Sequence, residues 1–361
     1  MTPKERWLAA IHMRLVDRLP FWPKLDGAYP HAQETPFCDM SIDSIHDWIG
    51  SDQHRNIVGC VKEVRKHTTV EMTKNADTMR TVFRSPHGEL EQINKFDAPS
   101  HAWHPTKFPV KTLEDIKILT DVFEDVEVVL DKDQLALAKE QYRDIGDQAI
   151  TTNGIGESPL MHWVEWIAGV ENAHFLLADY PQEVETLFDA MHSVLVDKTK
   201  LVCEYSPADI LYMVENTSTT LISPSQYKQY CAQHVGEYAK ITKETGKILV
   251  LHMCGHLKDV LPDLNQIPAK AFEAFTSPTL GNTSLLDGRS ACPDKCLVGG
   301  TNAILWTKSA EEIISKIEED LDELPHHRGI VVTSAGVMPP LCKPETIKQV
   351  CEWVKQYPVR M

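Results

Sequence analysis

The sequence lacks the features that several classes of protein require. No stretch approaches the roughly 20 consecutive apolar residues of a membrane-spanning helix. The N-terminal segment MTPKERWLAAIHMRL carries scattered charges and no apolar core before a cleavage site, so it does not resemble a signal peptide. No glycine-rich GxGxxG or Walker loop follows a candidate strand, which weakens nucleotide-binding interpretations. We therefore expect a cytoplasmic protein that does not contact a membrane.

Positive charge and paired cysteines are also scarce. The chain has 36 basic and 52 acidic residues, a formal net charge of −16, which argues against nucleic acid as a partner. Its nine cysteines are odd in number and spread over 361 residues, so a secreted disulfide framework is not expected. A chain of this length forms either one large barrel-type domain or two smaller domains.

Strand and helix patterns alternate from about residue 145 onward. Short strand-like runs occur at 148–154, 209–215, 247–253, 270–276, 295–301 and 329–335, with helical patterns between them. This order is typical of parallel βαβ units. With an early strand near Leu19 and one more among residues 100–145, the count approaches eight. The sequence therefore predicts an α/β fold, a (β/α)8 TIM barrel, with residues 1–361 as one domain.

The N-terminal part follows another pattern. Ser41 is a candidate N-cap for a helix that ends near Gly50. From Thr68 to Asp97 the residues alternate in character, and NAD and SPHG form candidate turns. We expect an N-terminal β-meander elaboration at about residues 41–100, which could also serve a homodimer.

The most informative motif is His252-Met253-Cys254, at the end of the apolar run ILVL. Residues two apart in an extended chain face the same side, so His252 and Cys254 could share a zinc ion. Burial as a hydrogen-bonded histidine and an inert thiol is the alternative. A catalytic zinc needs a third protein ligand, and Cys342 or, alternatively, Glu273 could supply it.

Other polar residues gather at the expected strand ends, where TIM barrels carry their active sites. Glu215 and Asn216 follow the run ILYMV and are the candidate catalytic residues. Glu215 is either a base or substrate contact, or a buried carboxylate with a backbone partner. Trp22 and Asp26 could line the same mouth, although Trp22 could equally be core. Asn153 and Asn302 lie at two further strand ends and are candidate substrate-binding residues.

An ordered set of motifs resembles the uroporphyrinogen decarboxylase-like superfamily, specifically its methyltransferase branch. The motifs are TPKERWLAAI, DRLPF, GESPLMHWVEWIAGVENAHFLLADYPQEVETLFDAM, LISPSQYKQY, LHMCGHLKDVLPDL, EAFTSP, VGGTNAILW and SAGVMPPLCKPETIKQV. The resemblance implies a TIM barrel. The arginine-rich N-terminal segment of true uroporphyrinogen decarboxylases is replaced here by FWPKLDGAYPH, so an octa-acidic porphyrinogen is an unsuitable substrate.

The resemblance also implies zinc, with His252 and Cys254 as ligands. The related methyltransferases have a cysteine directly after Ser-Pro-Gly in the final loop. Here the aligned stretch is Ser334-Ala335-Gly336, followed by Val337. Cys342 lies five residues later, and Glu273 is the other candidate for the third ligand.

The resemblance implies a zinc-dependent methyltransferase. It would move a methyl group between a small methylated, possibly methoxylated, substrate and a corrinoid (cobalamin) on a separate protein. A metal-free decarboxylase and a methylcobamide:thiol methyltransferase are the alternatives.

Overall fold

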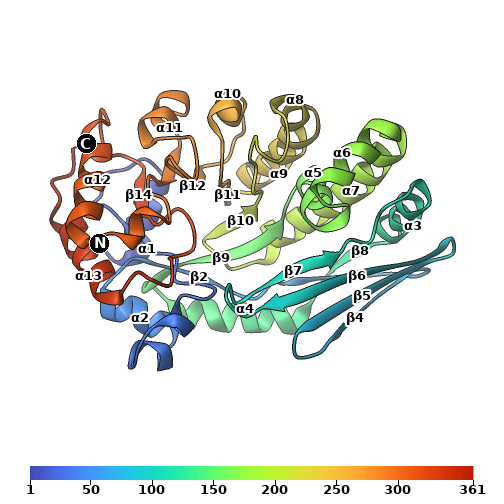
Figure 1. Ribbon diagram of the computed structural model, residues 1–361, viewed down its shortest axis with the longest axis horizontal. Helices are drawn as coiled ribbons and strands as arrows, with labels where there is room; N and C mark the ends of the chain where they lie inside the picture. Colours follow the sequence, from blue (N-terminus) through green and yellow to red (C-terminus); the bar gives the residue numbers. More distant parts are fainter. Residues whose placement is uncertain (361) are drawn as a thin grey trace.

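The computed structural model describes residues 1–360, and its centre is a nearly closed barrel of eight parallel strands (Figure 1). The strand order is β1-β14-β13-β12-β11-β10-β9-β2. The strands are β1 (Phe21–Trp22), β2 (Gln53–Asn56), β9 (Ala149–Gly156), β10 (Ile210–Val214), β11 (Ile248–His252), β12 (Ala271–Phe275), β13 (Cys296–Gly299) and β14 (Ile330–Thr333). The predicted TIM barrel is confirmed.

Helices connect and surround the strands. They are α1 (Pro3–Ile11), α2 (Ile42–Ile49), α3 (Leu113–Glu124), α4 (Lys132–Ile145), α5 (Pro159–His162), α6 (Val170–Asp179), α7 (Pro181–Tyr205), α8 (Pro224–Gln226), α9 (Ala232–Glu244), α10 (Leu261–Leu264), α11 (Leu285–Ala291), α12 (Ala310–Asp322) and α13 (Pro344–Gln356). Helix α2 matches its sequence signals, because the Ser41 hydroxyl accepts from Ser44 N and Gly50 adopts a left-handed φ of 77°.

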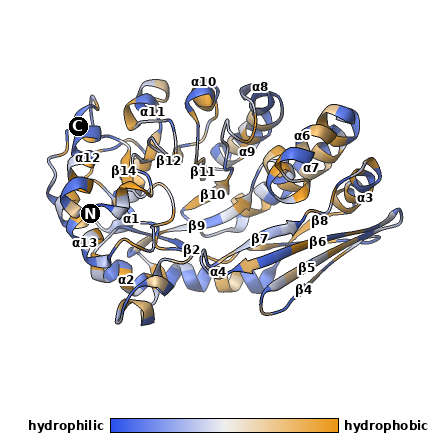
Figure 2. Ribbon diagram, in the orientation of Figure 1, coloured by the Kyte–Doolittle hydropathy of each residue, from blue (hydrophilic) through white to orange (hydrophobic). Residues whose placement is uncertain are grey.

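The barrel interior is apolar in the half nearer the amino ends of the strands. Alternate residues of each strand point inward, and side chains of α1 pack among them. The cluster comprises Trp7, Ala10, Ile11, Trp22, Ile150, Ile210, Ile248, Val250, Ala271, Cys296, Val298 and Val331. Strands β10 and β11 are apolar on both faces because helices cover their outer side (Figure 2). Polar inward side chains therefore begin only near the carboxyl ends of the strands.

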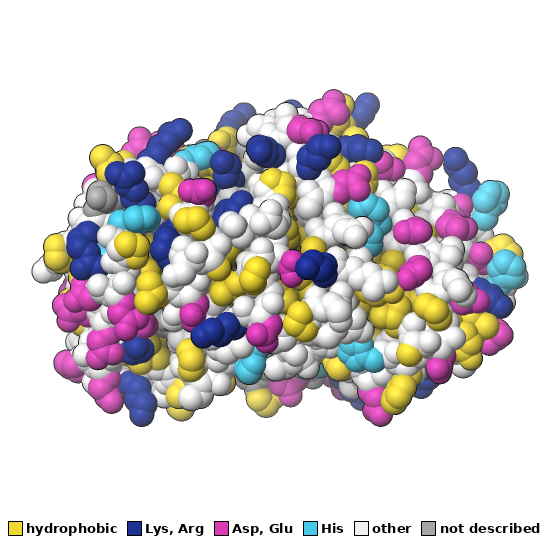
Figure 3. Space-filling view, turned by 90° about the horizontal axis from the view of Figure 1, so that it is seen from above, with side chains coloured by type: hydrophobic (Ala, Val, Ile, Leu, Met, Phe, Trp, Pro, Cys, Tyr) yellow, Lys and Arg dark blue, Asp and Glu magenta, His cyan; other side chains and the backbone are white. Residues whose placement is uncertain are grey.

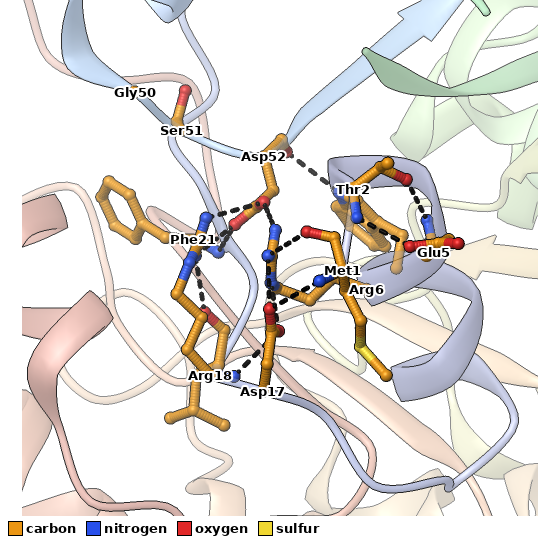
Figure 4. A network of polar contacts seen from close by, with 12 residues as sticks. Met1, Thr2, Glu5, Arg6, Asp17, Arg18, Phe21, Gly50, Ser51 and Asp52 are labelled. Carbon is orange, nitrogen blue, oxygen red and sulfur yellow. Dashed lines mark hydrogen bonds and ion pairs between the residues drawn. The ribbon is translucent and has the colours of Figure 1, made fainter. Parts of the chain in front are cut away.

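Strands β1 and β2 stand at the two ends of the sheet order and form no ladder with each other. Asp52 joins the two strands at their amino-terminal ends. Its backbone N donates to Phe21 O (2.7 Å), and its wholly buried carboxylate accepts from Phe21 N (3.0 Å) and from Arg6 and Arg18 (Figure 4). Pro23 has no N–H and cannot extend a ladder beyond Trp22. We call the unpaired stretch above Asp52 the seam.

The meander forms a separate antiparallel sheet that extends away from the barrel (Figure 1). Its strands are β4 (Thr69–Lys74), β5 (Thr78–Ser85), β6 (Gly88–Asp97) and β7 (Ala102–Lys107), in sequence order. Helix α3 packs against β5 and β6. Strand β3 (Val61–Val64) pairs with β8 (Glu127–Leu130) in a third sheet.

One expected barrel strand is elsewhere. The strands within residues 100–145 are β7 and β8, which pair outside the barrel, and the remaining barrel strand is β2, inside the range predicted for the elaboration. The prediction missed β2 because its sequence, QHRN, has no apolar run.

The described helices include none that is both long and apolar enough to cross a bilayer. On the face seen from above, basic and acidic side chains are interspersed (Figure 3). That face shows no continuous basic patch.

Candidate active site

The carboxylate of Glu273 is the centre of a charged network at the upper end of the barrel interior. Its Oε1 accepts from Lys24 Nζ at 3.0 Å, and its Oε2 lies against Tyr212 OH and His252 Nδ1. Glu273 is 1 % exposed, so these contacts replace water around the carboxylate. Four strands or strand ends, β1, β10, β11 and β12, supply the network.

The network fixes the charge of its members. Burial alone would raise the pKa of Glu273, but His252 and Lys24 outweigh it and hold that pKa well below its ordinary value. Burial likewise lowers the pKa of His252, yet the Glu273 carboxylate raises it to about 9. The imidazole therefore carries a proton at neutral pH. With Nδ1 directed at Glu273, Nε2 is the nitrogen left for Cys254, whose hydrogen bond also raises the pKa of His252, or for a ligand.

Cys254 belongs to a second series of hydrogen-bonded side chains. Its half-exposed thiol donates to Asn216 Oδ1 at 3.5 Å, and Asn216 Nδ2 donates to Glu165 Oε2 at 2.9 Å. Burial raises the pKa of Glu165 to about 7, although the bond from Asn216 opposes that shift. Sequence reasoning missed Glu165, because nothing in WVEWI distinguishes it from an ordinary helical glutamate.

Glu215 points away from the barrel interior. It is wholly buried, and its Oε2 accepts from Ser158 N at 2.8 Å beneath α5. Burial raises the pKa of Glu215 to about 8, against the bonds from Ser158. The structure thus gives Glu215 the contact expected of a buried carboxylate with a backbone partner. A catalytic role for it remains a prediction without a contact to the cavity.

The four predicted metal ligands do not all converge: His252 and Glu273 are in contact, whereas Cys342 lies apart. Cys342 is 2 % exposed, its thiol faces Lys343 O at 3.9 Å, and burial raises its pKa to about 12. The Glu273 carboxylate already accepts hydrogen bonds from Lys24, Tyr212 and His252. Within residues 1–360, no three His, Cys, Asp or Glu side chains are grouped to hold a metal. His252 and Cys254 are neighbours, and a third ligand that would complete a zinc site with them stays a prediction.

The predicted substrate-binding residues divide into two pairs. Trp22 and Asp26 line the cavity described below. Asn153 instead donates to Val58 O at 3.2 Å, and Asn302 donates to Ser277 Oγ and Pro278 O at 3.1 and 2.8 Å. The second pair therefore holds loops in place.

A cavity of about 770 Å³ lies against the charged network. Trp22, His54 and Tyr212 form its aromatic wall: the Trp22 and His54 rings stack with centroids 4.4 Å apart, and Tyr212 meets His54 edge-on at 5.4 Å. Lys24 and His252 add positive charge to the same wall. The sequence did not predict Tyr212 or His54 as site residues. Tyr212 lies inside an apolar run, and His54 lies on β2, which was not predicted as a strand. An aromatic cavity wall with a few charged groups is typical of a small-molecule site.

The fold and the cavity at the carboxyl ends of the barrel strands define a TIM-barrel protein with an enzyme-type site. The chain belongs to the uroporphyrinogen decarboxylase (URO-D) family, whose sequence profile matches residues 99–357.

The chain is also similar to two proteins of Methanosarcina mazei. The methylated-thiol–coenzyme M methyltransferase of Methanosarcina mazei is 29 % identical over 113 residues, which are 31 % of this chain and 30 % of that protein. The match therefore spans less than a third of the relative. A solved structure of a methyltransferase from Methanosarcina mazei superposes with a TM-score of 0.61 at 14 % identity, covering 99 % of this chain and 98 % of the other. That likeness shows the shared fold.

Proposed function

We propose that this chain is a methyltransferase that moves a methyl group between a small methylated substrate and a corrinoid carried by a separate protein. The observation that carries the proposal is the position of His252, held against the buried Glu273 carboxylate on the wall of an aromatic cavity at the barrel mouth. The family and the methyltransferase relative support the same reaction class.

Methyl transfer is an in-line displacement that leaves negative charge on the heteroatom losing the methyl group. His252 Nε2–H can donate to that heteroatom and stabilise the charge, while Glu273 holds the ring in place. Lys24 lies over the Trp22 ring at 5.6 Å and adds a second positive charge nearby. The stabilising charges in this proposal come from side chains of the chain alone. Zinc at His252 and Cys254 stays a prediction that needs a third ligand.

The aromatic wall suits a small methoxylated substrate, since its ring could pack against Trp22 and Tyr212 with the ether oxygen toward His252. A thioether is the other candidate methyl donor, because the M. mazei relative is named for methylated thiols. Either donor would place its heteroatom, oxygen or sulfur, at Nε2 of His252.

The partner would dock over the carboxyl ends of the strands. The strand ends and the loops that follow them expose apolar side chains there: Val214 is 42 % exposed, Ile304 47 %, Val337 46 % and Leu341 82 %. Exposed apolar side chains gathered beside a site are typical of protein interaction surfaces.

The cavity is poorly suited to the alternative, a decarboxylase for a substrate with many carboxylates. Its two permanent cations are already paired, Lys24 with Glu273 at 3.0 Å and Arg55 with Asp43 at 3.1 Å. Little uncompensated positive charge remains for several substrate carboxylates.

The test uses free cob(I)alamin as methyl acceptor and a panel of methoxylated phenols and methyl thioethers as donors. We expect the absorbance of methylcobalamin to appear with at least one donor and to be lost in His252→Asn. No methyl transfer from any donor, together with carbon dioxide release from an acidic substrate, would favour the decarboxylase.

A further inference from the structure

The cavity is lined by residues inside the barrel and by residues of helices outside the barrel wall. Its inner part contacts Trp22, Tyr212 and His252, which point into the barrel. Its outer part contacts His46 of α2 and Asp144 and Ile145 of α4, which lie outside the barrel. A continuous cavity can reach both sets only where the wall is open.

That opening coincides with the seam between β1 and β2. Below it, Asp52 bridges the two strands through its backbone N and its carboxylate. Above it, no hydrogen bond joins residues 22–26 to residues 53–56 in the described part of the chain. Every other pair of neighbouring barrel strands is hydrogen-bonded. The seam is therefore the break in the hydrogen-bonded wall, crossed on its inner side by the stacked rings of Trp22 and His54.

The outer part of the cavity differs from the aromatic inner wall. Asp43 and Arg55 pair there at 3.1 Å, and the exposed Asn56 and Asp144 add polar groups. A polar, hydrated opening suits a small water-soluble molecule better than a protein surface. The mouth end, by contrast, carries the exposed apolar Val214 and Val337.

We infer that the seam is a lateral entrance through which the small substrate reaches the barrel interior. Its functional use rests on the proposed methyl transfer: a partner protein docked over the mouth would block that route, while the seam leaves a separate path for the small reactant. The two reactants would then approach the methyl group from different sides, as an in-line displacement requires. The existence of the entrance can be tested without any methyl transfer.

The test places a reporter thiol inside the cavity. Gly154 lines the cavity, and a Cβ built there would meet its nearest neighbour, Tyr212 O, at 3.9 Å, an ordinary contact. Gly154→Cys is made with Cys38→Ser and Cys254→Ser, which remove the two native cysteines that are not fully buried. Its alkylation by iodoacetamide is followed by mass spectrometry.

Two further variants separate the routes. Asp144→Trp with Asn56→Trp fills the seam, and Val337→Trp adds bulk at the mouth. Lys139→Trp, on the exposed side of α4 opposite the residues of this helix that line the cavity, is the matched control. A second reporter, Val214→Cys, reads access at the mouth end.

We expect filling the seam to slow alkylation of the residue-154 thiol about tenfold relative to the Lys139→Trp control, and to leave the Val214→Cys thiol unchanged. Alkylation at residue 154 that responds to Val337→Trp but not to the filled seam would overturn the lateral entrance. That result would leave the proposed methyl transfer standing, and absence of methyl transfer would leave the entrance standing.

Discussion

The ammonium group of Lys24 lies 3.0 Å from Oε1 of Glu273, although 249 positions separate the two residues in the sequence. Both side chains are almost fully buried, at 9 % and 1 % exposure. The pair joins the first barrel strand to β12 and supplies the charge that balances Glu273 beside His252. It thus links the stability of the barrel to the chemistry of its mouth.

Lys24→Met should destabilise the protein by about 3 kcal/mol, because it leaves a buried carboxylate short of one partner. Urea unfolding followed by circular dichroism measures the change. Lys200→Met, which breaks an exposed pair with Asp197, is the control and should change stability by less than about 0.5 kcal/mol. Equal effects of the two substitutions would contradict a special role for the Lys24 pair.

His252→Asn should lower the rate of methyl transfer by a factor on the order of 100 or more, since it removes the proposed proton donor. His252 is also a partner of the buried Glu273 carboxylate, so we expect His252→Asn to lower the unfolding free energy by an amount similar to that in Lys24→Met. The rate of methylcobalamin formation is the measurement. Retention of the wild-type rate would exclude His252 from the chemistry.

Val337→Cys tests the missing metal ligand. Val337 lines the same cavity as His252, so a thiol there could join His252 and Cys254. A three-ligand set should bind zinc on the order of 100-fold more tightly than the wild type, measured by competition with a chromophoric chelator. Val337→Ser is the control. Stoichiometric, tight zinc binding by the wild type itself would mean that His252 and Cys254 already recruit a third ligand.

His46 should make folding stability depend on pH below neutrality. Burial, with smaller contributions from Arg55 and His54, lowers the pKa of His46 to about 3, and its Nδ1 lies 2.7 Å from Ser51 Oγ. The unfolded chain takes up a proton near pH 6.5 whereas the folded protein does not. The stabilisation is therefore complete above pH 6.5 and is lost as the pH falls toward 3.

At pH 5 this loss amounts to about 2 kcal/mol for His46 alone. His46→Gln should flatten that part of the stability profile, measured as unfolding free energy between pH 7 and pH 4.5. A variant with the same pH slope as the wild type would assign the effect to other histidines.

Much of the fold follows from local sequence patterns. The apolar runs ILYMV and ILVLH can be buried on both faces only as interior parallel strands, and both are barrel strands in the structure. Ser41 and Gly50 mark the ends of α2 because capping depends on neighbouring residues alone. Strand β2 lacked such a signal, since QHRN is held in the barrel by its pairing with β9 and by Asp52.

The sequence by itself determined that the strands alternate with helices, that His252 and Cys254 share a face at a strand end, and that positive charge is scarce. Only the tertiary structure decided the partners. In the structure Glu273 pairs with Lys24 and His252, and Glu215 accepts a hydrogen bond from Ser158. Cys342 lies away from these residues, and no ladder joins β1 to β2 at the seam. Closing a barrel brings together residues that are hundreds of positions apart, and their distances are set by packing that no local pattern encodes.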